Sequence, residues 1–232
     1  MKDTQKGNHN RKLEVFKQSP LFGHLSEAEL SEIADLATPC HFAKGEFIFH
    51  EGDPPNFCYV IQEGRVKIFK ESFSGKAFTV KVADRGDTLH AVVLFGGKPR
   101  WASAQAMDEV TLLRIRREEF LSFVIKRLSI LMKVIDILGD QTHSAHERLI
   151  DLVGERVEQR LLNVLNMLCY KFGTTLFFTC EELADLAGTT TETVIRTMNK
   201  LKKSGLISSS RGKIRILDET RLHRSSDGPY LT

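Results

Sequence analysis

The sequence TCEELADLAGTTTETVIRTMNKLKKSGLISSSRGKIRIL, residues 179–217, decides the fold of the C-terminal part of the chain. Thr179 and Glu182 stand three residues apart, as in a capping box that opens a helix. A glycine then ends this helix in a tight turn, and Thr189 or Thr190 can cap a second helix directly after it. Two short capped helices joined by a glycine turn have the proportions of a helix-turn-helix.

The second of these helices has an apolar side and a polar side. Val194, Met198 and Leu201 recur at spacings of four and three, so they are predicted to be buried together. Glu192 and Arg196 fall on the opposite side, where Arg can bond guanine O6 and N7 and Glu can accept from cytosine N4. The alternative is a surface ion pair between these two residues, worth about 0.3–0.5 kcal/mol. The polar side that we expect to face DNA consists of Glu192, Arg196, Asn199 and Lys200.

Basic residues concentrate in the second half of this stretch. Residues 196–215 include seven Lys or Arg and no acidic residue, whereas the whole chain has a formal net charge of only +3. Residues 205–217 are typical of two strands joined by a turn at Arg211 and Gly212, a wing whose tip can lie against DNA. We expect Arg211 and Lys213 to contact phosphates, because a local cluster of cations is typical of a surface that binds the DNA backbone.

Upstream of this stretch, apolar and small residues recur at alternating steps of four and three. Charged residues such as Asp136, Asp140, Glu147 and Arg148 flank them. This pattern favours a narrow coiled-coil seam, which needs a second chain, so we infer a parallel homodimer. The alternative is a single long helix that lies on the barrel of its own chain. The predicted seam consists of Leu131, Ile135, Leu138, Thr142, Ala145, Leu149 and Leu152.

The first half of the chain has a different pattern. Residues 1–12 are typical of a disordered polar tail. A helix is expected next, because Ser26 and Glu29 form a second capping box. From residue 39 to about 115, short alternating strands are broken by a glycine every 7 to 12 residues, which predicts an antiparallel barrel or sandwich.

Composition excludes several classes of protein. The sequence has no apolar run long enough to span a membrane and no signal peptide, and none of its four cysteines are spaced C-x-x-C. We therefore expect a cytoplasmic protein that makes no membrane contact. A P-loop, a G-x-S-x-G, an H-E-x-x-H and a paired-carboxylate signature are all absent from the sequence, so an enzyme is not expected.

The order of barrel, dimer helix and winged helix resembles the Crp/Fnr family of bacterial transcription regulators. The resemblance covers roughly residues 15–217 and rests on three motifs: LFGHLSEAELSEIA, KGEFIFHEGDPPNFCYVIQEGRVKIF and LADLAGTTTETVIRTMNKLKKSGLI. It implies an α+β chain with a cyclic-nucleotide-binding-like β-barrel (jelly roll) over residues 13–128 that senses an effector. A long dimerisation helix over 129–156 and a C-terminal winged helix-turn-helix over 157–232 follow.

The same resemblance implies a homodimer that binds double-stranded DNA at an inverted repeat and contacts RNA polymerase. Glu192 and Arg196 would read a TGA-type half-site. Two residues beside Glu192 and Arg196 differ from those of the best-known branches of the family. Thr191 replaces the extra arginine of the cAMP-receptor type, and Ile195 replaces the serine of the Fnr type. We therefore add Thr191 and Ile195 to the residues expected to face DNA, with Ile195 placed to touch a thymine methyl group.

The stretch GDTLHAVVLFGGKPRWASA, residues 86–104, corresponds to the phosphate-binding cassette of the cAMP-receptor branch. His90 and Ala91 replace the Gly-Glu pair of that branch, so the carboxylate for the ribose hydroxyl is missing. Arg100 stands one place out of register, and Trp101 takes the place of a serine. An unpaired ribose hydroxyl and phosphate would cost about 1–3 kcal/mol per buried group, so cAMP binding is not expected.

The sequence does not decide between two kinds of effector for the pocket. An Fnr-type iron–sulfur cluster is not expected, because it needs closely spaced cysteines near the N-terminus. One possibility is haem, ligated by His90, His143 or His146, which would make the protein a sensor of NO or CO; family members that control nitrosative-stress genes have a similar apolar cassette. The other is a small organic anion held by Arg100 and stacked on Trp101. The predicted pocket consists of His90, Phe95, Arg100, Trp101, His143 and His146.

Less expected alternatives are a cAMP-dependent regulator and a cyclic-nucleotide-binding module without DNA function. The second would lack the winged helix that residues 179–217 predict.

Overall fold

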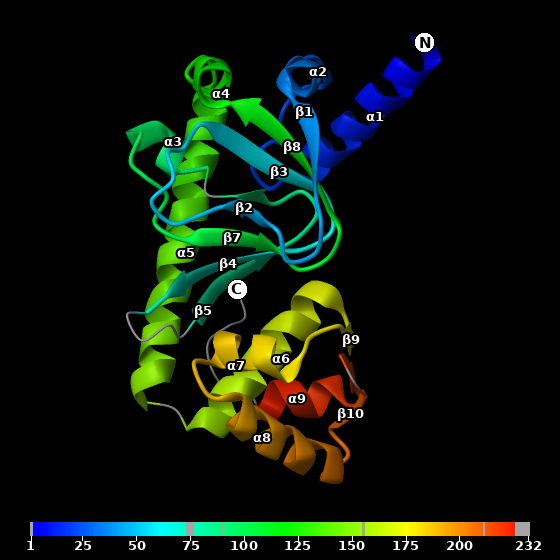
Figure 1. Cartoon of the computed structure of the whole chain (residues 1–232), viewed down its shortest axis with the longest axis vertical. Coiled ribbons are helices and arrows are strands. Elements are labelled where there is room, and N and C mark those ends of the chain that lie inside the picture. Colours follow the sequence, from blue (N-terminus) through cyan, green and yellow to red (C-terminus); the bar gives the residue numbers. More distant parts are fainter. Residues whose placement is uncertain (1, 73–76, 90, 155, 211, 226–232) are drawn as a thin grey trace. The chain divides into compact units, whose positions relative to one another are not determined.

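The computed structural model describes residues 2–72, 77–89, 91–154, 156–210 and 212–225 (Figure 1). The chain divides into two compact units, Met1–Leu138 and Gly139–Thr232, and helix α5 (Leu128–Gly154) has residues in both. Within these described ranges, no helix is both long and apolar enough to cross a membrane.

The first unit begins with two helices, and the first of them corrects a prediction. Helix α1 (Lys2–Gln18) includes the residues interpreted as a disordered tail, so that interpretation is wrong. Its end is anchored, because Val15 and Phe16 are fully buried, and Lys12 Nζ donates to two carbonyl oxygens at the end of α2 (Glu27–Leu36). These contacts stabilise a helix whose polar sequence gives no such signal.

Helix α2 begins as predicted. Ser26 Oγ accepts a hydrogen bond from the Glu29 N–H at 3.4 Å, and the Ser26 N–H donates to Glu29 Oε2 at 3.0 Å. This reciprocal pair is the capping box expected from the sequence. The helix then buries Leu30 and Ile33 against the core of the first unit.

Two antiparallel sheets of four strands form the sandwich of the first unit (Figure 1). Their strand orders are β1-β8-β3-β6 and β2-β7-β4-β5. One buried cluster contains Ile61 and Leu112 from the first sheet and Val66 and Ala104 from the second, so the two sheets share a core. The strands are β1 (Thr38–Phe42), β2 (Phe47–Phe49), β3 (Phe57–Glu63), β4 (Val66–Glu71), β5 (Ala77–Ala83), β6 (Thr88–Leu89), β7 (Ser103–Ala106) and β8 (Val110–Arg116).

A glycine turn joins β3 to β4. Gly64 has φ +87°, and a Cβ atom there would meet Glu109 O and lie 2.9 Å from Val110 Cγ2. Only glycine combines this backbone conformation with such a close approach of the neighbouring chain. The glycine spacing in the sequence therefore marked a real turn of the sandwich.

Two short helices connect the sandwich to α5. Helix α3 (Val93–Gly96) lies in the cassette, and α4 (Arg117–Val124) follows the last strand. Phe120 of α4 packs in a second buried cluster together with Ile130 and Val134 at the start of α5. The first turns of α5 are thus part of the core of the first unit.

The described residues of the second unit form the C-terminal part of α5, four further helices and a three-stranded antiparallel sheet of order β10-β11-β9. Helix α6 buries Leu161, Leu165 and Leu168 against the other elements, and α9 buries Leu222. The combination of sandwich, long helix and C-terminal helix-turn-helix confirms the predicted fold class. The elements of this unit are α6 (Val157–Phe172), β9 (Thr175–Leu176), α7 (Cys180–Ala187), α8 (Thr191–Lys203), β10 (Ile207–Ser210), β11 (Lys213–Ile216) and α9 (Glu219–Ser225).

Candidate nucleic-acid interface and effector region

Helix α7 begins and ends where the sequence predicted. Thr179 Oγ1 accepts a hydrogen bond from the Glu182 N–H at 3.2 Å, and the Thr179 N–H donates to Glu182 Oε2 at 2.6 Å. Gly188 follows the helix with φ +61°, a left-handed conformation that favours glycine. The capping box and the glycine turn are therefore confirmed.

Thr190 caps the second helix, α8. Its Oγ1 accepts a hydrogen bond from the Thr193 N–H at 3.3 Å. Thr189, the other threonine that the sequence left open as a cap, is instead buried in the turn, and its N–H donates to Ala184 O at 3.0 Å. The two threonines thus have different tasks, one in closing α7 and the other in opening α8.

Arg160 of α6 forms hydrogen bonds to the turn between α7 and α8. Its Nε donates to Ala187 O at 3.0 Å, and its Nη2 donates to Gly188 O at 3.2 Å. These carbonyl groups lie at the C-terminal end of α7 and have no hydrogen-bond partners within the helix. The helix dipole is negative at this end, so it favours a cation there. This role of Arg160 was not predictable from the sequence, because nothing in the local pattern links positions 27 residues apart.

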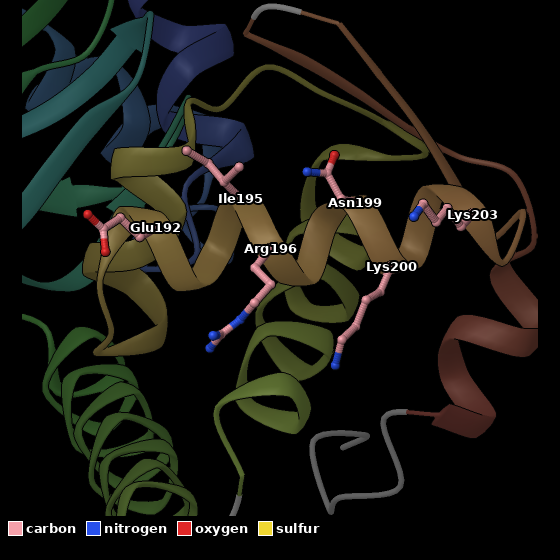
Figure 2. Close-up of a pocket in the computed structure, with 6 residues that line it drawn as sticks. All are labelled: Glu192, Ile195, Arg196, Asn199, Lys200 and Lys203. Atoms are coloured by element: carbon pink, nitrogen blue, oxygen red, sulfur yellow. The ribbon is translucent and has the colours of Figure 1, made fainter.

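The outward face of α8 carries the side chains expected to meet DNA. Val194, Met198 and Leu201 are buried, as predicted, and Thr197 between them is buried too. Thr191 and the opposite face are exposed. Figure 2 shows the side chains that line an open depression of about 500 Å³ on this face: Glu192, Ile195, Arg196, Asn199, Lys200 and Lys203. Lys203 was missed by the sequence analysis, although it lies one helical turn beyond Lys200 and Asn199.

Glu192 and Arg196 do not form the alternative ion pair. Figure 2 shows their side chains pointing apart, and in the part of the chain that the structure describes neither makes a hydrogen bond or an ion pair. Lys200 Nζ lies 2.9 Å from Glu158 Oε2 of α6, but both side chains are exposed. Such a pair contributes about 0–1 kcal/mol, so a phosphate can displace it.

The wing is present as two paired strands. β10 and β11 are antiparallel, with Ile207 opposite Ile216 and Ser210 opposite Lys213. Lys213 is exposed, as a phosphate contact requires, whereas Arg211 lies outside the described residues. A third strand, β9, pairs with β11 and was not predicted from the sequence, since it is only two residues long.

The predicted dimer seam lies largely on an exposed side of α5. Ile135 is 59% exposed and Leu149 58% exposed, and Leu138, Thr142 and Ala145 are exposed as well. Leu131 differs, because it packs partly against the core of the first unit. The side chain of Leu152 is outside the described part. Two exposed residues that the seam omitted, Leu128 and Met132, extend the apolar surface toward the start of the helix.

Arg100 is the most unusual member of the predicted effector pocket. It is only 2% exposed, Nη2 donates to Phe57 O at 2.7 Å, and Cζ lies 3.9 Å from the centre of the Phe49 ring. Burial lowers the pKa of Arg100, while nearby Tyr59 raises it. Nη1 is buried and has no hydrogen-bond partner among the described residues. A buried cation with a free donor can bind an anionic group.

The other pocket candidates lie in different surroundings. Phe95 packs edge-on against Phe120 at 5.9 Å, in the helical cluster of the first unit, and Trp101 is 46% exposed. His143 and His146 are exposed on the part of α5 that belongs to the second unit. His90 is outside the described residues. Arg117 Nε donates to Leu94 O at 2.7 Å and fixes the cassette helix α3, a contact that sequence spacing does not reveal.

Thiols and metal-binding groups add no further site to the described ranges. Within them, no three residues of the types His, Cys, Asp and Glu are grouped so as to hold a metal ion. Burial raises the pKa of Cys58 to about 12 and also raises that of Cys40. Both are neutral thiols near pH 7, and Cys58 is fully buried whereas Cys40 is half-buried.

Comparisons with known proteins match both halves of the chain. A family model described as a cyclic nucleotide-binding domain matches residues 39–127, and one described as a Crp-like helix-turn-helix domain matches residues 159–225. The chain is 26% identical over 219 residues to the CRP-like cAMP-activated global transcriptional regulator of Mycobacterium tuberculosis, covering 91% of this chain and 98% of that protein. It is 28% identical over 216 residues to the nitrogen fixation regulation protein FixK of Bradyrhizobium diazoefficiens, covering 90% of each.

Solved structures agree in fold. The structure of FixK2 from Bradyrhizobium japonicum matches with a TM-score of 0.75 and 19% identity, over 83% of this chain and 98% of that one. A CooA mutant from Carboxydothermus hydrogenoformans matches with a TM-score of 0.70 and 21% identity, over 93% and 95% of the two chains. At these identities the likeness supports the architecture alone.

Proposed function

The chain belongs to the Crp/Fnr family of DNA-binding transcription regulators, and we propose that it binds an inverted-repeat operator as a homodimer under the control of an effector. Its relatives are regulators and not enzymes. The operator half-sites are of the TGA type, RNA polymerase is a further partner, and the protein acts in the cytoplasm. One observation carries this proposal: α8 exposes Glu192 and Arg196 without a partner on the described surface, beside a row of basic residues.

Base reading follows from the chemistry of this face. Arg196 donates two hydrogen bonds to guanine O6 and N7, Glu192 accepts from cytosine N4, and Ile195 contacts a thymine methyl group. Each good contact discriminates against the wrong base by about 1–3 kcal/mol. Asn199 and Thr191 flank these three, while Lys200, Arg211 and Lys213 contact phosphates and set the position of the helix.

The three functional regions correspond to residues 13–128, 129–156 and 157–232. The first senses the effector, the second pairs with a second copy of the chain, and the third reads DNA. The boundary between the compact units, after Leu138, falls inside the second region. A change in the first unit can therefore reach the third through one continuous helix.

Two effectors have support from particular residues. Haem would supply an iron that binds NO or CO. One of His90, His143 and His146 would be its axial ligand. The alternative is a small organic anion, supported by the free Nη1 donor of buried Arg100, with Trp101 as a surface for stacking.

An absorption titration of the purified protein with haem separates these two effectors. A saturable Soret band that shifts with NO or CO and is lost in one of the variants His90→Ala, His143→Ala and His146→Ala supports haem. Absence of a saturable band excludes haem and leaves the anion, whose binding should then depend on Arg100.

The operator itself can be selected from random-sequence duplexes by the wild-type protein. Arg196→Ala should bind the selected duplex no better than a scrambled one, while the protein keeps its normal oligomeric state. Lys171→Ala removes an exposed cation elsewhere in the second unit and serves as the control. Selective binding by Arg196→Ala would refute the assignment of α8 as the reading helix.

A further inference from the structure

Helix α9 lies against α6 and connects two places in the second unit (Figure 1). Near its start, Arg221 Nη1 donates to Ser204 O at 2.8 Å, and Ser204 is the residue at which α8 ends. At its other end, Ser225 O accepts a hydrogen bond of 2.8 Å from Gln159 Nε2, in the first turn of α6. The short helix α9 therefore joins the C-terminal end of the reading helix to the beginning of α6.

The side of α6 toward α9 carries a polar stripe. Gln159, Asn163 and Asn166 recur at steps of four and three, so they lie on one side of the helix. Gln159 Nε2 also donates to Asn163 Oδ1 at 3.2 Å, and both asparagines are buried. Helix α9 buries Leu222 as its apolar contribution. The alignment of α9 on α6 therefore depends on particular hydrogen bonds more than on apolar area.

The two helices run in opposite directions. Burial raises the pKa of the Cys169 thiol near the end of α6, and the nearby Glu219 carboxylate raises it further, so the start of α9 lies beside the end of α6. Ser225, at the end of α9, is bonded to Gln159 at the beginning of α6. Helix α9 is thus fixed along α6, and Arg221 reaches α8 from a defined position.

The first turn of α6 contacts the three other helices that follow it. Glu158 Oε2 lies 2.9 Å from Lys200 Nζ of α8, Gln159 bonds to α9, and Arg160 bonds to the end of α7. Together with Arg221, these contacts close a ring that runs from α6 through α9 to α8 and back to α6. A phosphate can displace the exposed pair of Glu158 and Lys200, and the path through α9 then still ties the end of α8 to α6.

We propose that Arg221 is a positioning residue for operator reading and that α9 is a clamp on the C-terminal end of α8. Arg221 acts through α8 and not on DNA, because its guanidinium donates to Ser204 O, where the negative end of the helix dipole favours a cation. The clamp holds the last turns of α8 at a fixed place on α6, so that Glu192 and Arg196 meet the base edges in one orientation. The inference rests on the DNA-binding function proposed above and assigns to it a residue outside the helix-turn-helix.

The test compares Arg221→Ala with Arg224→Ala, which removes an exposed cation from the same helix. Each protein is titrated with the selected operator and with a scrambled duplex at several salt concentrations. Arg221→Ala should bind the operator about fivefold more weakly, as expected for the loss of one hydrogen bond, and should bind the scrambled duplex like the wild type. Its log–log salt slope should not change, because no phosphate contact is lost. Arg224→Ala should keep the wild-type preference for the operator.

Gln159→Ala tests the other end of the clamp. It should weaken operator binding by about the same factor, and the double variant Arg221→Ala/Gln159→Ala should lose no more than either single variant, because breaking one end already opens the clamp. Arg221→Lys keeps the charge and one donor, so it should restore part of the operator affinity, and it carries the same test should Arg221→Ala not fold.

Hydrogen exchange gives a readout without DNA. The amides of residues 200–203, at the end of α8, should exchange faster in Arg221→Ala and Gln159→Ala than in the wild type. Arg224→Ala should exchange at the wild-type rate. Unchanged exchange in the first two variants would show that α9 does not hold α8.

The binding outcomes separate this inference from the proposed function. Equal losses of Arg221→Ala on operator and scrambled duplex, with a salt slope lower by about one, overturn the clamp and make Arg221 a phosphate contact. Additive losses in the double variant, or an unchanged preference for the operator in Arg221→Ala, also overturn it. Failure of the proposed function has a different signature: Arg196→Ala then keeps selective binding, whereas hydrogen exchange of residues 200–203 still reports on the clamp.

Discussion

At the scale of the residue, the cap of α7 was predictable because a capping box joins positions three apart. The partners of Arg160 and Arg100 were not, because their contacts join positions 27 and 43 residues apart. The choice between Thr189 and Thr190 as the cap was open for a similar reason. Both are adjacent hydroxyl residues, and only the path of the turn decides which one is buried.

The turn at Gly64 gives a prediction with a matched control. Gly64→Ala and Gly45→Ala both place a side chain on a left-handed residue, with φ +87° and +84°, at a cost of about 1–2 kcal/mol. Only at Gly64 would the new Cβ also collide with the backbone of Glu109 and with Val110. Denaturant titrations should therefore show a clearly larger loss of unfolding free energy for Gly64→Ala, and equal losses would contradict this account.

Cys58 gives a prediction about pH. Burial raises its pKa from 9.0 to about 12 in the folded protein, so between these values the unfolded chain loses the thiol proton while the folded chain keeps it. The folded state then binds more protons, and stability falls as pH rises through this window. Cys58→Ala should flatten that alkaline decline in unfolding free energy relative to the wild type. Parallel declines in the two proteins would show that Cys58 does not contribute.

At the scale of the element, α1 shows where pattern recognition failed. Its first turns are polar and include glycine and asparagine, which are poor helix formers, so the sequence favoured a tail. Burial of Val15 and Phe16 and the bonds from Lys12 to the end of α2 depend on the tertiary fold. The opposite holds for α8, where the apolar spacing alone identified the buried and the exposed sides.

Arg160 supports the helix-turn-helix without being on either helix. Arg160→Ala removes two hydrogen bonds that a charged donor makes to the end of α7. A hydrogen bond of this kind contributes about 1.5–3 kcal/mol to the free energy of unfolding. We expect a lower melting temperature and weaker operator binding, with the preferred operator sequence unchanged. Arg160→Lys keeps the charge but not the forked geometry and should recover only part of the loss. A changed base preference in Arg160→Ala would mean that the residue acts on reading directly.

The exposed side of α5 predicts the effect of a charge in the seam. Ile135→Glu places a carboxylate on the surface proposed to meet a second copy, so sedimentation should show a shift from dimer to monomer. Ile195→Glu is the control, because it adds the same charge at an exposed isoleucine on α8. A dimer that survives Ile135→Glu would show that the exposed side of α5 is not the dimer interface.

At the scale of the whole molecule, the order of sandwich, long helix and winged helix was readable because each region has its own periodicity. Glycine turns mark the sandwich, steps of four and three mark α5, and two capping boxes mark the helical starts. The surroundings of the effector residues were not readable. Phe95 and Arg100 are five positions apart, yet Phe95 packs with Phe120 and Arg100 with Phe49.

A dimer that reads an inverted repeat requires a fixed spacing between half-sites. Recognition helices related by two-fold symmetry meet major grooves about one helical turn, or 34–36 Å, apart. Inserting half a turn of DNA between the half-sites should therefore reduce affinity toward that of a single half-site, and inserting a full turn should restore part of it. Gel-shift titrations measure this, and insensitivity to the insertion would indicate independent monomers.

The division of labour on α8 has a consequence for how regulators of this kind diverge. Packing depends on Val194, Met198 and Leu201, which are buried, whereas Glu192, Ile195 and Arg196 are exposed on the opposite side of the helix. Substitutions at the exposed positions can accumulate with little loss of stability, so gene duplicates can acquire new target promoters while the scaffold is inherited intact. The exposed face of α8 can thus change the DNA sequence it reads while the buried face keeps the fold.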